Sequence, residues 1–211
     1  HEVSCTLISE ETGTKKIGSQ PSEFYITTDP VDGTTNAVRG IPFMATAIAV
    51  SKAPYLKDVE TALVSDLFHN VTYTAQRDQG ALRNGKKIKP SKTSSLEEAV
   101  VGVDFNMFRL GELVARLEGV LMRTRYLRHL GANALEVCYV ADGTTDAFID
   151  IRGKLRVTDI AASYLIIREV GGIMVTPEGT ELNAPLAATQ RVAFIAAANK
   201  TIYKTIKKFL V

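Results

Sequence analysis

The chain lacks tryptophan and has only two cysteines, Cys5 and Cys138, among its 211 residues. Two cysteines so far apart in the sequence form no disulfide framework, and such low cysteine usage is typical of a reducing compartment. The chain also lacks an apolar run of the roughly 20 residues that a membrane-spanning helix needs, and it shows no signal-peptide pattern. These absences predict a cytoplasmic protein that has no membrane partner.

An excess of charge of one sign is lacking as well. The formal net charge is only +2, and no long basic run occurs, so the sequence gives no indication of nucleic-acid binding. The apolar share of 45% and the charged share of 23% are ordinary for a globular protein. A chain of this length can bury a sizeable core, either as one large domain or as two small ones.

The hydrophobic pattern predicts a mixture of strands and helices. Alternating or continuous apolar residues predict strands over residues 3–8, 23–28, 43–50, 59–68, 71–76, 81–89, 99–105, 127–130, 145–151, 173–176 and 192–197. Apolar residues at helical spacing predict helices over residues 110–123, 132–141, 157–170 and 201–210. We therefore expect an α+β or α/β layered fold in two subdomains: a mainly antiparallel sheet over residues 1–96, and an α/β unit over residues 97–211.

The start of the chain gives a further expectation. It begins at His1 and enters the first predicted strand with almost no lead-in. We therefore expect a segment to precede it in the natural protein.

The segment Asp-Pro-Val-Asp-Gly-Thr-Thr-Asn at residues 29–36 carries the clearest chemical information. Its two carboxylates attract hard cations such as Mg²⁺, which prefers oxygen ligands. The glycine and threonines that follow expose backbone N–H groups, which attract anions. Metal and phosphate would therefore meet within a few ångströms, as a metal-assisted phosphate hydrolase requires.

Two other interpretations of this segment are a calcium-binding loop and a simple turn. A calcium-binding EF-hand loop needs acids at alternate positions and glycine at the sixth, and this spacing does not match. Asp-Pro and Asp-Gly are also common turn formers, so either pair alone would indicate only a turn. The two pairs together with Thr34 and Thr35 favour a ligand site.

The segment closely resembles the signature of the inositol monophosphatase superfamily of Mg²⁺-dependent, lithium-sensitive phosphatases. Two further elements of that family occur in the same order: a Glu-Glu pair at residues 10–11, and an aspartate that opens a helix, Asp159 in Thr-Asp-Ile-Ala-Ala-Ser. The family usually has tryptophan before that aspartate, whereas this chain has Thr158. Without the resemblance, Asp159 would be interpreted as a carboxylate stabilised by the helix dipole.

The resemblance implies a role for each matching residue. Two to three Mg²⁺ ions are implied: Glu10, Asp29 and the Val31 carbonyl would hold the first, Asp29, Asp32 and Asp159 the second, and a weaker third would depend on Glu10. Gly33, Thr34 and Thr35 would bind the phosphate, and Thr34 would orient the attacking water. The catalytic set is then Glu10, Asp32 and Thr34.

The family also has known general properties that become expectations here. They are a sugar-phosphatase fold of alternating α and β layers, whose first helical layer this chain would lack, inhibition by lithium, and a homodimer. The family uses an aspartate from its amino-terminal helical region to help activate the water, and nothing in this chain matches it. The missing aspartate bears on whether this chain can activate the water, and it does not change the expected fold.

The alcohol part of the substrate is expected to meet two later segments. Asn133 in Gly-Ala-Asn-Ala would flank the ring, and Asp150 in Phe-Ile-Asp-Ile-Arg would bind its hydroxyls. These segments look most like archaeal members that hydrolyse inositol phosphate and fructose 1,6-bisphosphate. Arg152 is then a candidate for binding a second phosphate, unless it pairs with a nearby carboxylate. His69 and His129 lack zinc-ligand spacing and are interpreted as surface or structural residues.

The leading expectation is therefore a phosphomonoesterase that acts on a small sugar or inositol phosphate. One alternative is a 3′(2′),5′-bisphosphate nucleotidase, although those relatives tend to continue the motif with Lys-Glu where this chain has Thr35-Asn36. Another is a non-catalytic subunit that binds metal or phosphate, suggested by the unmatched amino-terminal aspartate.

Overall fold

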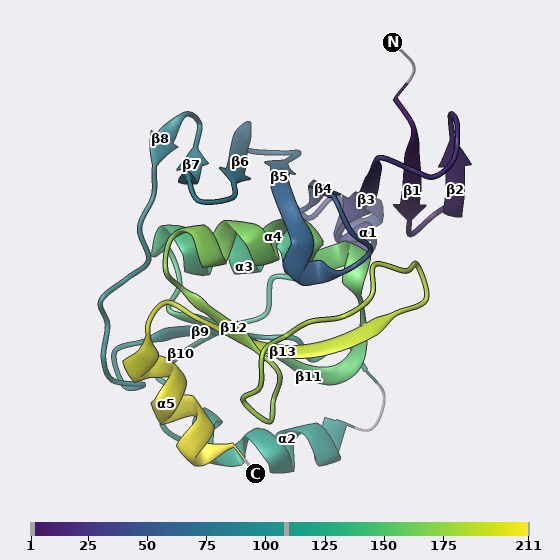
Figure 1. Ribbon diagram of the computed structural model, residues 1–211. Helices are drawn as coiled ribbons and strands as arrows, with labels where there is room; N and C mark the ends of the chain where they lie inside the picture. The colour runs from purple at the N-terminus through teal and green to yellow at the C-terminus, as the bar shows by residue number, and fades with distance from the viewer. Residues whose placement is uncertain (1–2, 108–109, 211) are drawn as a thin grey trace.

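The computed structural model describes residues 3–107 and 110–210, which form two β-sheets and several helices (Figure 1). The first sheet has eight strands in the spatial order β2 (Gly13–Ile17), β1 (Cys5–Ser9), β3 (Phe24–Asp32), β4 (Ala45–Ser51), β5 (Val59–Asp66), β6 (Val71–Gln76), β7 (Gly80–Arg83) and β8 (Lys86–Lys87). The second has five strands in the order β10 (Tyr126–Arg128), β9 (Val100–Val103), β11 (Ala147–Arg156), β13 (Arg191–Ala197) and β12 (Ile173–Val175).

The helices α1 (Thr34–Arg39), α2 (Leu110–Leu121), α3 (Asn133–Asp142), α4 (Val157–Glu169) and α5 (Lys200–Phe209) complete the fold, with a short 3₁₀ turn at Leu56–Asp58. Helices α3 and α4 lie between the two sheets, and α2 and α5 lie on the other face of the five-stranded sheet (Figure 1). This layering confirms the predicted α+β sandwich. No helix of the described residues is long and apolar enough to cross a membrane.

Helix α4 is the centre of the packing. Its residues from Val157 to Ile167 are all buried, as expected for a helix that is covered on every side. It packs on β4 and β5 of the first sheet and shares one apolar core with α3 and with Phe148 and Phe194 of the second sheet. The amino-terminal end of α4 is therefore held firmly against both sheets.

Most predicted strands and helices are present, with ends that shift by a few residues. Strand β2 was not predicted, because its sequence Gly-Thr-Lys-Lys-Ile is mostly exposed and does not alternate. No helix was predicted in the Gly-Thr-Thr-Asn segment at residues 33–36, whereas residues 34–39 form the short helix α1. The strand predicted over residues 81–89 divides into β7 and β8 at Asn84-Gly85, a dipeptide that favours tight turns and in which both residues have positive φ.

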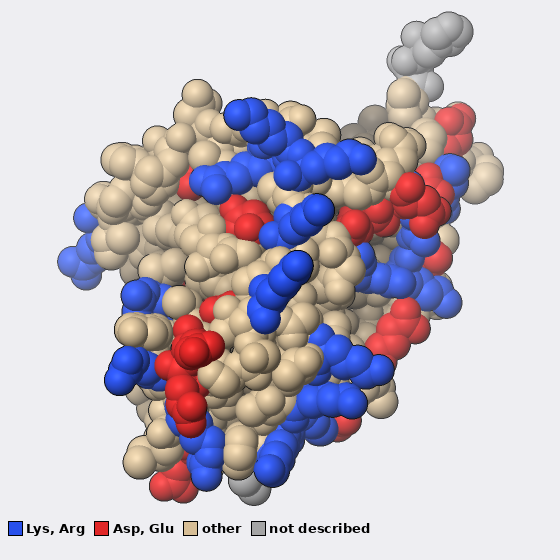
Figure 2. Space-filling model, turned by 90° about the vertical axis from the view of Figure 1, so that its left-hand side faces the viewer, with Lys and Arg blue, Asp and Glu red and all other residues tan. Residues whose placement is uncertain are grey.

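The edge of the first sheet at β7 and β8 is strongly basic. Figure 2 views the side of the molecule on which these strands lie, and lysine and arginine side chains gather over the upper part of this face. The exposed basic residues that this segment contributes are Arg83, Lys86, Lys87, Lys89 and Lys92. Charged side chains on an edge strand oppose the addition of another strand, so this edge is protected from aggregation.

Candidate active site

A cavity of about 480 Å³ opens where the first sheet, α1, α3 and α4 meet. Its lining contains nine of the eleven residues that the sequence predicted for the site. The complete lining is Glu10, Asp29, Val31, Asp32, Gly33, Thr34, Thr35, Asn36, Ile41, Phe43, Asn106, His129, Leu130, Gly131, Asn133 and Asp159. Asp150 and Arg152 are the two predicted residues that it does not include.

A bulge in β3 brings Asp29 and Asp32 to the same side of the sheet. Asp29 lies opposite Ala47 and Asp32 opposite Ala45, so three steps on β3 match two steps on β4. Side chains alternate between the faces of a regular strand, and a separation of three would place the two carboxylates on opposite faces. The extra residue of the bulge, in the segment Pro30-Val31, turns the Asp32 side chain to the same face as Asp29. Both aspartates are buried.

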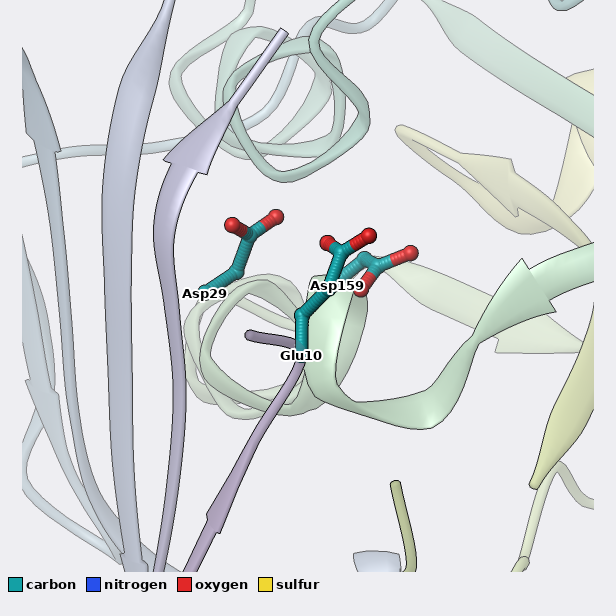
Figure 3. A group of neighbouring side chains, drawn as sticks. All are labelled: Glu10, Asp29 and Asp159. Carbon is teal, nitrogen blue, oxygen red and sulfur yellow. The ribbon is translucent and has the colours of Figure 1, made fainter. Parts of the chain in front are cut away.

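Three carboxylates from distant parts of the chain converge beside this bulge. Glu10 follows the end of β1, Asp29 lies in β3, and Asp159 lies in the first turn of α4. One oxygen atom from each lies within 4.8 Å of the others, and Figure 3 shows the three side chains extending toward a common space. These hard oxygen donors fit a divalent cation such as Mg²⁺, which prefers oxygen ligands.

The electrostatics of the cluster show that it needs positive charge. Burial and the neighbouring Asp159 carboxylate raise the pKa of Asp29 to about 7. Burial also raises the pKa of Asp159, although Thr158 and the Arg156 backbone N–H donate hydrogen bonds to it. The Arg156 guanidinium contacts the Glu10 carboxylate and supplies part of the missing charge. A bound metal would supply the rest and would favour the ionised carboxylates.

Asp32 has a different environment from the other three carboxylates. Its two oxygens accept hydrogen bonds from the backbone N–H groups of Asn133 (3.0 Å) and Ala134 (2.7 Å), at the start of α3. Burial and the nearby Asp29 raise its pKa well above the ordinary value. Asp32 therefore connects the carboxylate cluster to α3 through hydrogen bonds, and the three oxygen atoms that converge come from the other carboxylates.

The turn after Asp32 is fixed by close packing. Gly33 has φ +90°, and a Cβ atom at this position would lie 3.1 Å from the Ala132 Cβ and 3.1 Å from the Phe43 carbonyl oxygen. The Thr34 hydroxyl donates a hydrogen bond to the Val31 carbonyl (3.1 Å). The predicted metal ligand at Val31 and the predicted catalytic threonine are thus in contact.

Asn36 and Glu136 hold the opposite wall against this turn. The buried Asn36 amide donates hydrogen bonds to the carbonyl oxygens of Phe43 and Leu130, each at 2.7 Å. The Glu136 carboxylate accepts hydrogen bonds from the backbone N–H groups of Leu130 (3.3 Å) and Gly131 (3.2 Å). The wall at Leu130 and Gly131 is therefore bonded from two sides, a role that the sequence did not predict for either residue.

Glu136 gives a prediction about pH. Burial raises its pKa from 4.5 to about 8, so the folded protein holds a proton that the unfolded chain releases above about pH 4.5. This contribution to stability is complete below the unfolded pKa and is lost as the pH rises through about 8. We expect Glu136→Gln to lose less unfolding free energy than the wild type between pH 5 and pH 9, as measured by urea unfolding. Parallel curves for the two proteins would contradict the assignment.

Asn133 and Asp150, predicted to contact the alcohol, and Arg152, predicted to bind a second phosphate, have different surroundings. Asn133 lines the cavity, and its buried Oδ1 has no hydrogen-bond partner among the described residues. Asp150 is fully buried and binds the Arg152 guanidinium at 2.6 Å. Arg152 also binds Asp104 at 2.6 Å, so its charge is used within the protein, as in the ion-pair alternative considered from the sequence.

Asn106 and His129 line the cavity although the sequence analysis gave them no role in the site. Asn106 follows the end of β9, and His129 follows the end of β10. These strands run parallel, so their carboxyl ends meet at the same edge of the sheet, where ligands commonly bind. The two residues could have been found from that rule if the parallel pairing had been known.

Comparison with known proteins agrees with the geometry of the site. Residues 3–209 match the model of the inositol monophosphatase family. A fructose-1,6-bisphosphatase/inositol-1-monophosphatase from Methanothermobacter thermautotrophicus is 38% identical over 213 residues, which cover 97% of this chain and 75% of that protein. A bifunctional NADP phosphatase/NAD kinase from Methanococcus maripaludis is 36% identical over an alignment of 223 positions, and the match covers 96% of this chain and 38% of that protein.

A solved structure has a similar fold over nearly the whole chain. It is a protein from Pyrococcus horikoshii that is described as having similarities to inositol-1 monophosphatase, and it has a TM-score of 0.85 and 31% sequence identity. The match covers 98% of this chain and 77% of that one.

Proposed function

This chain belongs to the inositol monophosphatase family, and on this basis we propose that it hydrolyses myo-inositol monophosphate, fructose 1,6-bisphosphate or both. The family makes it a phosphatase that acts on phosphoric monoesters. The choice of substrates is supported by the relative from Methanothermobacter thermautotrophicus, whose name contains both activities.

The convergence of Glu10, Asp29 and Asp159 beside the Gly33 turn is the observation that carries this proposal. Four carboxylates, including Asp32, line one cavity with a turn whose first helical N–H groups have no acceptor within the helix. Such an arrangement can hold cations and an anionic phosphate side by side. A purely structural cluster would not need to face a cavity.

Each residue has a part in the proposed mechanism. The four carboxylates and the Val31 carbonyl would hold Mg²⁺, with Glu10, Asp29 and Val31 at one ion and Asp29, Asp32 and Asp159 at another. The backbone at Gly33, Thr34 and Thr35 would bind the phosphate oxygens. When bound, divalent metal lowers the pKa of water and neutralises charge on the leaving oxygen. The Thr34 hydroxyl, which already points to the Val31 carbonyl, would orient the attacking water. Asp32 would keep this turn docked on α3.

Several finer properties belong to the same proposal. The number of Mg²⁺ ions would be two to three, lithium would inhibit, and the protein would act as a cytoplasmic homodimer. The donor set of four carboxylates supports the metal, and the family resemblance supports the rest. The division into a metal- and phosphate-binding part at residues 1–96 and a completing part at residues 97–211 is likewise proposed.

A second candidate substrate is a nucleotide phosphate. The relative from Methanococcus maripaludis is named as an NADP phosphatase joined to an NAD kinase, and this chain matches only 38% of its length. The nucleotidase alternative from the sequence belongs to the same chemical class. A direct comparison of substrates separates these possibilities.

The proposal is tested by phosphate release. We expect the protein to release phosphate from inositol 1-phosphate and fructose 1,6-bisphosphate in the presence of Mg²⁺, and we expect EDTA to abolish the release and Mg²⁺ to restore it. Faster release from NADP or from adenosine 3′,5′-bisphosphate would favour a nucleotide substrate. Protein that binds Mg²⁺ without hydrolysing any of these esters would favour the non-catalytic alternative.

A further inference from the structure

Asn106 and His129 form a hydrogen-bonded pair that lines the active-site cavity. They follow the ends of β9 and β10, so the second sheet contributes this wall of the cavity. The His129 Nε2 atom lies 3.2 Å from the Asn106 Oδ1 atom, and its Nδ1 atom lies 3.1 Å from the Val103 carbonyl oxygen. The Phe105 ring packs edge-on against the imidazole. Both residues are exposed to the cavity, although His129 is held at both ring nitrogens.

The backbone of Asn106 is anchored by buried charges. Its N–H group donates a hydrogen bond to the Asp104 carboxylate (2.8 Å), and its carbonyl accepts one from the Arg152 guanidinium (2.9 Å). Arg152 is in turn bound by Asp104 and Asp150, whose side chains are almost fully buried. Three buried charged side chains therefore support one exposed asparagine, which is more support than a surface loop requires.

The Asn106 amide keeps one polar end for a ligand. If the imidazole donates through Nε2, the amide oxygen accepts and the NH₂ group faces outward as a donor. If Nε2 carries a lone pair, the amide turns over, its NH₂ group donates to the ring, and its oxygen faces outward. In both cases a hydrogen-bonding group remains available, and a hydroxyl can satisfy it because a hydroxyl both donates and accepts.

The charge of the cavity favours a hydroxyl over a phosphate at this wall. The charged residues among its described lining are Glu10, Asp29, Asp32 and Asp159, and no lysine or arginine is included. Arg152, the residue predicted to bind a second phosphate, is neutralised by two carboxylates. A second phosphate at this wall would therefore lack a lysine or arginine partner among the described lining residues.

We propose that the Asn106–His129 pair binds the hydroxyl groups of a polyol phosphate, and that Arg152, with Asp104 and Asp150, positions this pair instead of binding the substrate. The proposal rests on the proposed phosphatase function and adds the residues that recognise the alcohol. Arg152 and Asp150 then have a supporting role. The substrate hydroxyls are bound directly by Asn106 and His129, which belong to no recognisable sequence motif.

The kinetic test compares substrates with and without hydroxyls. For Asn106→Ala and His129→Ala we expect the KM for inositol 1-phosphate to rise about three- to ten-fold, the value of one neutral hydrogen bond, with little change in kcat. The fold-increase in KM for p-nitrophenyl phosphate, which has no hydroxyls on its alcohol part, should be at most half as large. His69→Ala is the matched control, because His69 is bound to Asp66 outside the cavity, and it should leave both KM values unchanged.

The positioning role of Arg152 is tested by a double-mutant cycle. We expect Arg152→Lys to raise the KM for inositol 1-phosphate as Asn106→Ala does, and the double variant to be no worse than the worse single variant. Additive effects would show that Arg152 binds substrate independently. An effect of Arg152→Lys confined to fructose 1,6-bisphosphate would also overturn the proposal, because it would identify a second-phosphate site.

A binding measurement keeps the test independent of turnover. The chain has three histidines, so the His129 imidazole signals can be assigned in an NMR spectrum by comparison with His129→Ala. We expect inositol 1-phosphate to shift these signals and His69 signals to stay in place. If the protein hydrolyses no ester but the shift occurs, the pair still binds and only the proposed function fails. If hydrolysis occurs without the shift and without the KM changes, the pair does not recognise substrate.

Discussion

Asp159→Asn is expected to lower metal-dependent turnover about a thousandfold, because several kcal/mol of metal-based transition-state stabilisation would be lost and each 1.4 kcal/mol changes a rate tenfold. The substitution keeps the shape of the side chain and one oxygen, while it removes the charge from a buried cluster that contains Glu10 and Asp29. The folded protein should not lose stability, because a carboxylate whose pKa is raised by burial already opposes its own ionisation. Turnover at saturating Mg²⁺ and the Tm in EDTA measure the two effects.

Asp146→Asn is the matched control for this variant. Asp146 is also a buried aspartate, and it accepts hydrogen bonds from Ser91 and from the Val100 backbone N–H, outside the cavity. It should lower the Tm and leave the affinity for Mg²⁺ unchanged, the reverse of Asp159→Asn. Near-wild-type turnover of Asp159→Asn at saturating Mg²⁺ would remove Asp159 from the metal site.

Gly33→Ala is expected to have the second large effect, on stability and turnover together. An alanine at φ +90° is strained, and its Cβ would press on Ala132 and on the Phe43 carbonyl, so we expect the free energy of unfolding to fall by about 1–3 kcal/mol. The turn would also shift relative to the carboxylates, and a displacement of about 1 Å costs on the order of a hundredfold in rate. Urea unfolding and phosphate release measure the two losses.

The control for this variant separates strain from crowding. Gly171 has a similar positive φ of +79°, and an added Cβ would meet nothing within 4 Å. Gly171→Ala should therefore lose stability through strain alone and keep its turnover. If Gly33→Ala retains turnover as well as Gly171→Ala does, the position of the turn does not control the reaction.

The sequence predicted the site because its residues lie in recognisable motifs. The Asp-Pro-Val-Asp-Gly-Thr-Thr-Asn segment, the Glu-Glu pair and Asp159 are recognisable in the sequence alone, and the structure places Glu10, Asp29 and Asp159 together. Local periodicity also predicted the long buried helix α4. These features are local in the sequence, or they follow from a shared motif.

Other features depend on contacts that the sequence pattern does not contain. The bulge in β3 depends on the register with β4, and the helix α1 is too short to show a helical period. Strand β2 has a polar sequence and exists because it pairs with β1. The sequence could not decide between the two alternatives for Arg152. An ion pair with a carboxylate and the binding of a phosphate use the same guanidinium group, and only the structure shows the pairing with Asp104.

The hydrogen bonds around the Gly33 turn have a consequence for how the chain folds. Asp32 bonds to Asn133 and Ala134 across 101 and 102 residues, and Asn36 bonds to Leu130 across 94 residues. Forming contacts of such long range costs the entropy of closing a large loop. The lining of the site comes from both parts of the fold, so a ligand that binds only the folded protein stabilises both sheets together against unfolding.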